Sequence, residues 1–476
     1  MNFDDDFKML IGGELGAGTA TFDVINPANA KAFAKAPDAS KSDLDSAVSA
    51  ARRAFPSWSA TPIAERKAKL VELSNAIMAQ ADGLKRLLTR EQGKPHGDAE
   101  FEIMGAAMWL QGAAALDLPV TINEDSDERY SETRHVPLGV VGAIAPWNFP
   151  MLLAMFKLGP ALLAGNAVVL KPSPFTPLTT LKFGEIASQI LPAGVLNIIS
   201  GGDALGPWMT AHPGFDKISF TGSTQTGRRV MASAAPTLKR VTLELGGNDP
   251  AIVMPDVDVE KVAEQLFWAA FQNNGQICIA TKRMYVHKDV YEPLKEALVA
   301  YARTVKIGDG AEQGTQIGPI NNLTQYERVL GLIQDAKDKG YTFLLGGEKS
   351  DVPGYFVPVT IIDNPPEDSR IVQEEQFGPV LPLIKFDDID DVIAKANATE
   401  YGLGGSVWGN DDDRAFEIAQ RIASGTVWVN ETQHLSPMAA FGGMKQSGVG
   451  VEGGVEGLLE YTNAQTLVRK KRPLTA

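Results

Sequence analysis

Cysteine is almost absent from the chain, with 1 among 476 residues, and histidine is scarce, with 5. A single cysteine forms no internal disulfide, which excludes a disulfide-framework secreted protein. Cysteine-rich zinc and iron–sulfur sites are excluded as well. So few histidines argue against a histidine-cluster metal centre, although carboxylates could still hold a metal. We therefore expect no metal site.

Excess positive charge is also missing, because 44 Lys and Arg stand against 58 Asp and Glu, a net charge of −14. Non-specific nucleic-acid binding needs a basic surface, so no nucleic-acid partner is expected. A hydrophobic content of 44% excludes a disordered chain. At about 150 residues per domain, the length predicts two to three domains.

An uninterrupted run of about 20 apolar residues, the signature of a membrane helix, is lacking. The most apolar stretch, residues 136–170, holds one charge, Lys157, and prolines at four positions divide it into short pieces. The N-terminus is acidic where a signal peptide would be basic. We expect a cytoplasmic protein with no membrane association.

Hydrophobic periodicity predicts helices first and alternating elements afterwards. Helical spacing covers residues 47–55, 63–88 and 101–116. After residue 136, short apolar runs alternate with helical segments, which is typical of parallel strands covered on both faces. The expected strands are 140–145, 167–170, 195–199, 217–220, 241–245, 251–254, 284–287, 343–345, 355–362 and 380–386, and the expected helices are 151–163, 177–189, 259–271 and 290–305.

Five motifs occur along the chain in a fixed order. They are Pro146-Trp147-Asn148-Phe149-Pro150, the segment 220–227 (FTGSTQTG), the segment 243–248 (LELGGN), the segment 271–278 (FQNNGQIC) and the segment 374–380 (EEQFGPV). Together they resemble the aldehyde dehydrogenase superfamily, of the NAD(P)-dependent, non-acylating type, over residues 26–462. Each motif alone would be weak evidence, but five in order are highly specific.

The resemblance implies two doubly wound parallel-sheet domains and a small β oligomerisation arm. We expect residues 1–245 to form N-terminal helices and a Rossmann-like NAD(P)-binding domain. Residues 246–441 would form the catalytic domain with the nucleophilic cysteine. Residues 128–136 with 458–468 would form the arm, because strands that leave their own domain must pair elsewhere. A homodimer or homotetramer is expected.

Three residues carry the expected chemistry. A thiolate adds readily to a carbonyl, and the resemblance makes Cys278 the nucleophile, although a lone cysteine is more often a small buried hydrophobe. Glu244 would be the general base, against the alternative of a strand-end salt bridge. Asn148, with the Cys278 backbone N–H, would form the oxyanion hole, against the alternative of an asparagine that only satisfies a turn.

The sequence lacks a GxGxxG fingerprint after a first strand, so the usual dinucleotide-binding signal is not claimed. The resemblance places the cofactor across the ends of a parallel sheet. Lys171 would reach the adenine-side ribose, and Gly222 and Ser223 would begin a helix whose N-terminus suits a pyrophosphate. Taken alone, these two residues indicate an ordinary strand–helix turn. The full set of expected cofactor-binding residues is Trp147, Lys171, Ser173, Gly222, Ser223, Gly227, Leu245, Glu375 and Phe377.

The chain departs from the commoner family pattern at four positions. Pro174 stands where a glutamate often binds the ribose 2′-hydroxyl, so nothing there would repel a 2′-phosphate, and NAD or NADP is the expected cofactor. Asn248, Ala440 and Val451 replace a frequent Lys, Pro and Arg respectively, and we expect them to adjust packing and subunit contacts.

The expected aldehyde pocket is apolar and aromatic, with no Arg or Lys placed to meet a substrate carboxylate. This favours a medium-sized hydrophobic or aromatic aldehyde, although core packing explains the same residues almost as well. The mouth would lie at 431–438, where His434 is more simply a partly exposed loop residue. The expected pocket residues are Met151, Trp268, Phe271, Ile277, Ile279 and Phe441, with Trp147 beside them.

The favoured function is therefore oxidation of an aldehyde to a carboxylic acid through a cysteine thiohemiacetal and thioester. A CoA-acylating aldehyde or semialdehyde dehydrogenase is the alternative, disfavoured because such relatives lack the base at Glu244. A non-catalytic protein on the same fold is the third reading, disfavoured because Cys278, Glu244 and Asn148 are all present.

Overall fold

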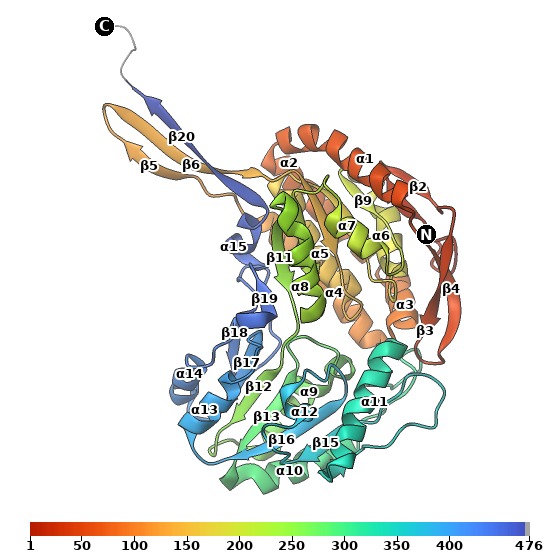
Figure 1. The fold of residues 1–476 in the computed structure, drawn as a ribbon, viewed down its shortest axis with the longest axis vertical. Helices are drawn as coiled ribbons and strands as arrows, with labels where there is room; N and C mark the ends of the chain where they lie inside the picture. The colour runs from red at the N-terminus through yellow and green to blue at the C-terminus, as the bar shows by residue number, and fades with distance from the viewer. Residues whose placement is uncertain (472–476) are drawn as a thin grey trace.

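The computed structural model describes residues 1–471, which form two α/β units and a projecting arm (Figure 1). The core of each unit is a mostly parallel sheet with helices on both faces, so the doubly wound α/β class is confirmed. The first sheet takes its strands from residues 9–244 and 448–449, and the second from residues 249–429. A domain boundary at residue 245 stays a prediction.

The first sheet has eight strands in the order β19-β11-β10-β7-β8-β9-β1-β2. Its five central strands run parallel, and four of them are buried along their whole length, as their continuous apolar runs predict. The bounds are β1 (Met9–Ile11), β2 (Glu14–Gly16), β7 (Val140–Ile144), β8 (Ala167–Lys171), β9 (Leu196–Ile198), β10 (Lys217–Thr221), β11 (Arg240–Glu244) and β19 (Gly448–Val449).

Helices α1, α7 and α8 pack along one side of this sheet, and α2, α4, α5 and α6 along the other. Helix α1 begins with a capping box, in which the Ser40 hydroxyl accepts from the Asp43 N–H and the Asp43 carboxylate accepts from the Ser40 N–H. The bounds are α1 (Lys41–Ala60), α2 (Ile63–Ala79), α3 (Ala81–Gln92), α4 (His96–Ala115), α5 (Pro150–Ala164), α6 (Leu178–Ala187), α7 (Leu205–Ala211), α8 (Thr224–Ala234) and α15 (Gly454–Leu459).

The second sheet has seven strands in the order β14-β15-β16-β13-β12-β17-β18, all parallel to their neighbours except β14. Its strands are β12 (Asp249–Val253), β13 (Thr281–His287), β14 (Thr342–Leu345), β15 (Thr360–Asp363), β16 (Val380–Phe386), β17 (Gly404–Trp408) and β18 (Thr426–Val429). Its helices are α9 (Val259–Phe271), α10 (Lys288–Ala302), α11 (Leu323–Asp338), α12 (Arg370–Gln373), α13 (Ile389–Asn397) and α14 (Asp412–Ala419).

Some boundaries differ from the expected ones. The helix expected over 63–88 is two helices, because Gln80 leaves the helical conformation at φ −113° and ψ 10°. The strand expected over 355–362 is shorter, and the proline at 358 has no N–H for a sheet ladder. The N-terminal strands β1 to β4, including the hairpin β3 (Thr21–Asn26) and β4 (Lys31–Pro37), were not expected.

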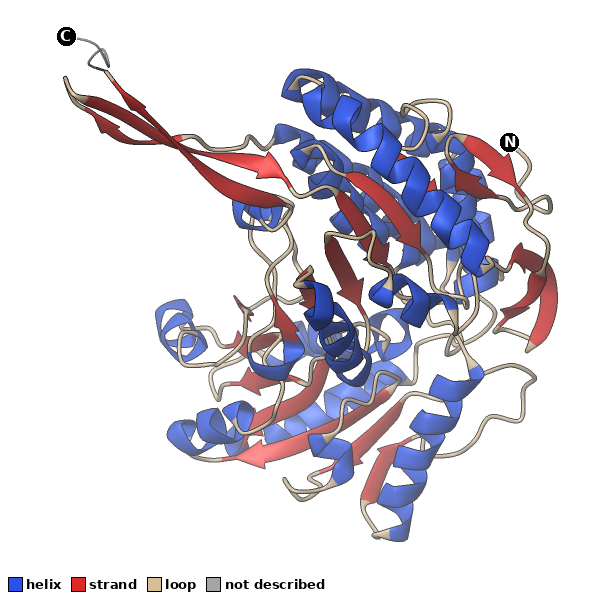
Figure 2. Ribbon diagram, turned by 45° about the horizontal axis from the view of Figure 1, so that its top comes forward, coloured by secondary structure: helices blue, strands red, loops and turns tan. Residues whose placement is uncertain are grey.

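The arm is a three-stranded antiparallel sheet that projects from the body of the molecule (Figure 2). It contains β5 (Thr121–Asp125), β6 (Arg129–Pro137) and β20 (Thr462–Lys470). The two expected arm segments do pair with each other, but residues 458 and 459 belong to α15 and β5 is an additional strand.

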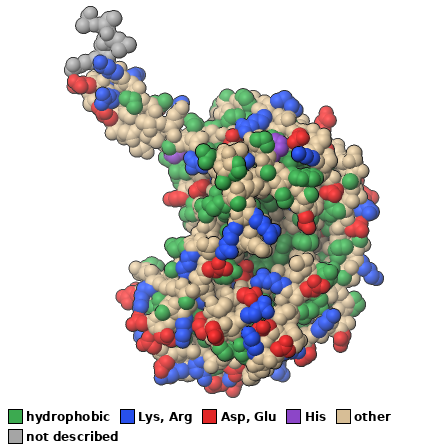
Figure 3. Space-filling view, viewed as in Figure 1, with side chains coloured by type: hydrophobic (Ala, Val, Ile, Leu, Met, Phe, Trp, Pro, Cys, Tyr) green, Lys and Arg blue, Asp and Glu red, His purple; other side chains and the backbone are tan. Residues whose placement is uncertain are grey.

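Within residues 1–471, no helix is long and apolar enough to cross a membrane. The apolar helix α5 is instead buried in the core of the first unit. On the face shown in Figure 3, Lys and Arg side chains are interspersed with Asp and Glu.

Residues that follow the parallel strands of the first sheet meet at one edge. Asn148 follows β7, Lys171 ends β8, Gly222 follows β10 and Glu244 ends β11. The carboxyl ends of parallel strands form the usual ligand-binding edge of an open α/β sheet. The second unit faces the same edge through Cys278, just before β13, and Glu375, just before β16.

Candidate active site

Cys278 lies on a tight turn between α9 and β13. Asn273, Asn274 and Gly275 adopt left-handed conformations in succession, with φ of 49°, 60° and 70°. Glycine is required at 275 because a Cβ there would collide with the Gly378 carbonyl oxygen. The turn leaves Cys278 partly exposed, at a point where it lines two different cavities.

The first cavity, here called the inner cleft, brings together most of the expected cofactor residues. Trp147 and Phe377 form an edge-to-face pair within it, with ring centroids 5.3 Å apart. The predicted residues that line it are Trp147, Asn148, Gly222, Ser223, Leu245, Cys278, Glu375 and Phe377, joined by Pro146, Thr221, Gly246, Gln325 and Arg328.

The Glu375–Phe377 segment is held by hydrogen bonds from Gly247, which follows β11, and from Gln325 in α11. The Glu375 Oε1 atom accepts from the Gly247 N–H at 3.0 Å. Phe377 has a φ of 50°, an uncommon conformation for a bulky residue, and the Gln325 amide donates to its carbonyl oxygen at 3.0 Å. The fold thus stabilises a strained backbone that places the Phe377 ring in the cleft.

The N-terminus of α8 opens onto the inner cleft. Ser223 caps this 11-residue helix, with its Oγ accepting from the Thr226 N–H at 3.3 Å. Gly227 does not line the cleft, because it packs against the Leu245 side chain, with which any Cβ would clash. Its expected cofactor contact stays a prediction.

A second, outer cavity of about 690 Å³ lies between α7 and α8, and Lys171, Pro174 and Arg229 line it. Lys171 is 5% exposed, and burial lowers the pKa of its ammonium to about 8, opposed by the carboxylates of Asp203 and Asp38. Ser173 does not line this cavity, because its hydroxyl turns back to accept from the Phe175 N–H.

A third, apolar cavity of about 340 Å³ begins at Cys278, and three of the expected pocket residues, Ile277, Ile279 and Phe441, line it. Sequence reasoning missed the contribution of α5, since an apolar helix gives no signal for which side chains meet a cavity. The other lining residues are Phe101, Asn148, Phe149, Leu152, Leu153, Phe156, Gln272 and 431–435.

Three expected pocket residues do not line the apolar cavity. Met151 is fully buried at the start of α5, where its N–H donates to the Glu102 carboxylate at 2.8 Å. Phe271 is fully buried against Phe267. Trp268 donates to the Tyr301 hydroxyl and lines a separate surface cavity. That surface cavity adjoins the apolar cavity, because the two share Gln272 and residues 431–433, whereas Phe271 packs in the core of the second unit.

Glu244 lies at the end of β11 and is 3% exposed, behind the walls of these cavities. Its Oε1 atom has no hydrogen-bond partner among the described residues. Burial, with the nearby Glu452 carboxylate, raises its pKa well above the usual range, opposed by the Lys157 ammonium. A buried, unpaired carboxyl with a raised pKa has the properties of a general base.

Lys157 and Glu452 form a buried ion pair at 2.6 Å, and Lys157 also donates to the Thr221 hydroxyl at 2.7 Å. The sequence did mark Lys157 as the one charge in the apolar stretch 136–170. Its partner lies 295 residues later, so no local signal could identify it.

Asn148 is 4% exposed, and its Nδ2 donates to the Gln276 carbonyl oxygen at 3.0 Å, so the amide points at the cysteine turn. The backbone carbonyl oxygen of Asn148 accepts a hydrogen bond from Lys94 Nζ at 2.9 Å. Lys94 is in turn paired with Glu102 at 2.6 Å, and both side chains are fully buried. This pair, which sequence reasoning missed, fixes the turn that carries Asn148.

Burial raises the pKa of the Cys278 thiol to about 12. Lys282 opposes this shift, and the carboxylates of Glu244, Asp249 and Glu375 add to it. The thiol is therefore mostly protonated at neutral pH and needs a base to become a nucleophile.

Two doubly wound units, with the Cys278 thiol between an inner cleft and an apolar cavity, have the architecture of an aldehyde-oxidising oxidoreductase. The aldehyde dehydrogenase family profile matches residues 15–467. The chain belongs to the aldehyde dehydrogenase family.

Relatives in sequence and in structure agree with this assignment. A Pseudomonas protein described as "Probable aldehyde dehydrogenase" is 43% identical over 97% of this chain and 94% of its own length. Phenylacetaldehyde dehydrogenase of Pseudomonas fluorescens is 39% identical over 97% of this chain and 95% of its own. The NAD⁺ complex of a Bacillus cereus aldehyde dehydrogenase has a TM-score of 0.96 at 36% identity, covering 99% of this chain and 98% of that one.

Proposed function

We propose that the protein oxidises an apolar aldehyde to its carboxylic acid with NAD⁺ or NADP⁺, through a thioester on Cys278. The observation that carries this proposal is that Cys278 and Asn148 line both the inner cleft and the apolar cavity. A carbonyl carbon entering from the apolar side would reach the sulfur where the two cavities join. The carbonyl oxygen of the substrate would meet hydrogen-bond donors at the same place.

The oxyanion donors would be Asn148 Nδ2 and the Cys278 backbone N–H. No described residue accepts from this N–H, and the Asn148 amide already points toward the same turn. As the Cys278 sulfur bonds to the carbonyl carbon, its proton passes to Glu244 and negative charge collects on the oxygen. Donors fixed in advance at that point stabilise the thiohemiacetal.

The residues of the inner cleft fit a bound nicotinamide nucleotide. Glu375 and the capped α8 N-terminus offer polar partners, and the Trp147 and Phe377 rings offer apolar walls. When bound, the cofactor supplies a hydride acceptor, which converts the thiohemiacetal to a thioester. After Glu244 has released the first proton to solvent, it would take a proton from water, whose oxygen displaces the Cys278 thiolate and releases the acid.

Alanine in place of Asn148 is expected to lower the rate of the first turnover about 10²-fold to 10³-fold, the usual cost of one oxyanion donor. The measurement is stopped-flow detection of NAD(P)H at saturating aldehyde. Thermal stability should change little by comparison. An unchanged first-turnover rate would remove Asn148 from the proposed oxyanion hole.

We propose that NADP is accepted as well as NAD because the outer cavity can hold a 2′-phosphate. Pro174 offers no carboxylate there, and Arg229 is exposed in the wall with no hydrogen bond or ion pair to any described residue. Lys171 adds a second cation, and Asp203 is the one acidic residue of the wall. A guanidinium is well suited to bind phosphate.

Methionine in place of Arg229 is expected to lower kcat/KM for NADP by at least about tenfold, because a charge-assisted hydrogen bond contributes roughly 1.5–3 kcal/mol. The value for NAD should change much less. Arg228→Met is the matched control, since the neighbouring Arg228 pairs with Glu400 at 2.8 Å and does not line the cavity. An equal loss for both cofactors, or none for either, would contradict this assignment.

The substrate class follows from the cavity beyond Cys278, whose wall is apolar apart from Asn148, Gln272 and the 431–434 segment. Kinetics with an aldehyde panel, with NAD and with NADP, test this choice. Hydrophobic and aromatic aldehydes should have the highest kcat/KM, and a preference for short charged aldehydes would contradict the proposed substrate class.

The CoA-acylating alternative makes a different prediction. In that reaction, NAD(P)⁺ reduction stalls after one turnover until CoA is added.

We also propose the division into a cofactor-binding unit, a catalytic unit and an oligomerisation arm. The projecting arm supports this division, because β20 and β5 leave sheet edges that favour pairing with another chain. A homodimer or homotetramer should therefore appear in sedimentation experiments.

A further inference from the structure

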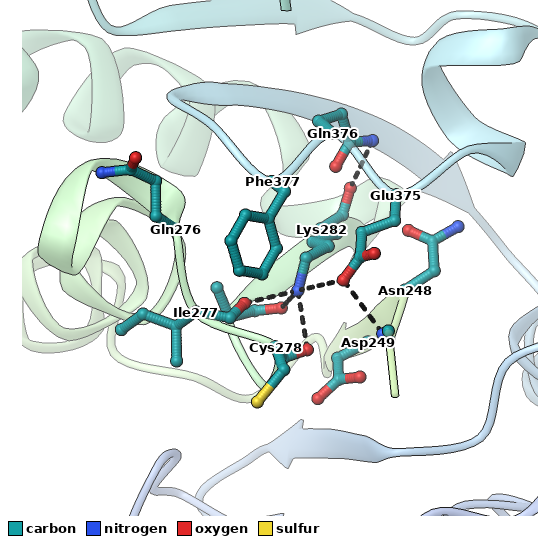
Figure 4. A network of polar contacts seen from close by, with 12 residues as sticks. Asn248, Asp249, Gln276, Ile277, Cys278, Lys282, Glu375, Gln376 and Phe377 are labelled. Atoms are coloured by element: carbon teal, nitrogen blue, oxygen red, sulfur yellow. Dashed lines mark hydrogen bonds and ion pairs between the residues drawn. The ribbon is translucent and has the colours of Figure 1, made fainter. Parts of the chain in front are cut away.

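Lys282 is a buried cation in contact with the turn that carries Cys278. It is the second residue of β13, 3% exposed, and its ammonium is surrounded by backbone carbonyl groups (Figure 4). Lys282 Nζ donates to the carbonyl oxygens of Ile277 at 2.8 Å, Cys278 at 2.8 Å and Ala280 at 3.2 Å. One side chain thus gathers three carbonyls of the turn.

The contact to Ile277 bears directly on the oxyanion hole. The Ile277 carbonyl and the Cys278 N–H belong to one planar trans peptide, so they point in opposite directions. The carbonyl is fixed by Lys282 and by the Ala280 N–H at 3.1 Å, and therefore the N–H is directed away from them. A charged donor on the carbonyl also polarises the peptide and makes its N–H a stronger donor.

The same ammonium faces the charges around the thiol. The carboxylates of Glu244, Asp249 and Glu375 and burial itself all disfavour a thiolate at Cys278, and Lys282 is the cation that opposes them. Lys282 Nζ lies 3.9 Å from Glu375 Oε1, so it connects the cysteine turn to the inner-cleft wall. Burial raises the pKa of Asp249 to about 7, and Lys282 opposes this shift too.

We propose that Lys282 is a positioning residue of the reaction: it orients and polarises the peptide that supplies the Cys278 N–H, and it favours the thiolate. The assignment rests on the proposed function, because the oxyanion and the thiolate belong to that reaction. Lys282 does not reach either cavity, so it acts through the turn and touches no substrate.

The test compares Lys282→Met and Lys282→Gln with Lys182→Met. The control removes another buried lysine, which pairs with Glu185 in α6. The first readout is the rate of iodoacetamide alkylation against pH without aldehyde or cofactor. Because Cys278 is the one cysteine of the chain, alkylation of cysteine reports on this thiol alone. The second readout is first-turnover NAD(P)H formation.

In Lys282→Met we expect the alkylation profile to move to higher pH by about one unit, equivalent to about tenfold slower alkylation at a fixed pH. The first turnover should slow by at least about tenfold. Lys182→Met should match the wild type in both. Lys282→Gln keeps a polar side chain but lacks the charge, so its alkylation profile should also move to higher pH. If Lys282→Met does not fold, Lys282→Gln serves as the test variant.

An unchanged alkylation profile in a folded Lys282 variant overturns the thiolate role, and an unchanged first turnover overturns the oxyanion role. Neither result affects the proposed function if the wild type is active. If the wild type shows no aldehyde-dependent reduction, the proposed function fails, while alkylation still decides whether Lys282 favours the thiolate.

Discussion

Cys278→Ala is expected to lose aldehyde-dependent NAD(P)H formation by at least about 10⁴-fold, the scale found when a covalent nucleophile is removed. The thiol is the one atom shared by the inner cleft and the apolar cavity that can form a covalent bond to a carbonyl carbon. No second cysteine exists to replace it. Steady-state kinetics with a reactive apolar aldehyde measure the loss.

Cys278→Ala should still bind the cofactor, because the other residues that line the inner cleft are unchanged. Cofactor-induced thermal stabilisation of Cys278→Ala should therefore equal that of the wild type. In the wild type, iodoacetamide should inactivate the enzyme in proportion to the cysteine modified. A Cys278→Ala variant that still reduces NAD(P)⁺ in the presence of aldehyde would contradict the covalent mechanism.

Glu244→Gln is expected to lower steady-state turnover about 10²-fold to 10⁴-fold, the usual contribution of a general base. The first turnover should be less affected than hydrolysis of the thioester, so a burst of NAD(P)H should precede slow turnover. The substitution keeps the size of the side chain in its buried site. Stopped-flow absorbance separates the burst from the steady state, and a proportional loss in both phases would contradict a hydrolytic role.

The pH dependence follows from the raised pKa of Glu244. Acidification protonates this carboxyl at a higher pH than an ordinary glutamate, so activity should fall well before pH 4.5 is reached on lowering the pH. The Cys278 pKa of about 12 adds a rise in rate toward alkaline pH, because deprotonation of the thiol becomes easier. In Glu244→Gln the acid limb of kcat should flatten, as measured between about pH 5 and 9.

The elements that position the site could be predicted from the sequence because buried parallel strands are short and continuously apolar. Strands β7, β8 and β10 and helix α9 lie close to their expected bounds. Strands β1 and β2 were missed, since β2 is exposed and β1 has only three residues, too few for a periodic signal. The break at Gln80 was missed because no Pro or Gly marks it.

Some residues of the candidate site could also be predicted from the sequence, and others could not. The motifs indicated Cys278, Glu244 and Asn148, but Lys282, Lys94 and Glu102 carry meaning only through burial. Which charges become buried depends on contacts between distant segments, as with Lys94 and the carbonyl of Asn148, 54 residues apart. The expected apolar pocket residues only partly match the cavity wall, since the α5 side chains that line the cavity and the α9 side chains that pack in the core are both apolar.

Intact mass of Glu244→Gln, quenched after one turnover with an aldehyde and NAD⁺, tests the central claim most directly. The proposal predicts that the protein gains the mass of the acyl group, that peptide mapping places the acyl group on Cys278, and that hydroxylamine removes it. A burst of NADH formation without any adduct on Cys278 would contradict the account.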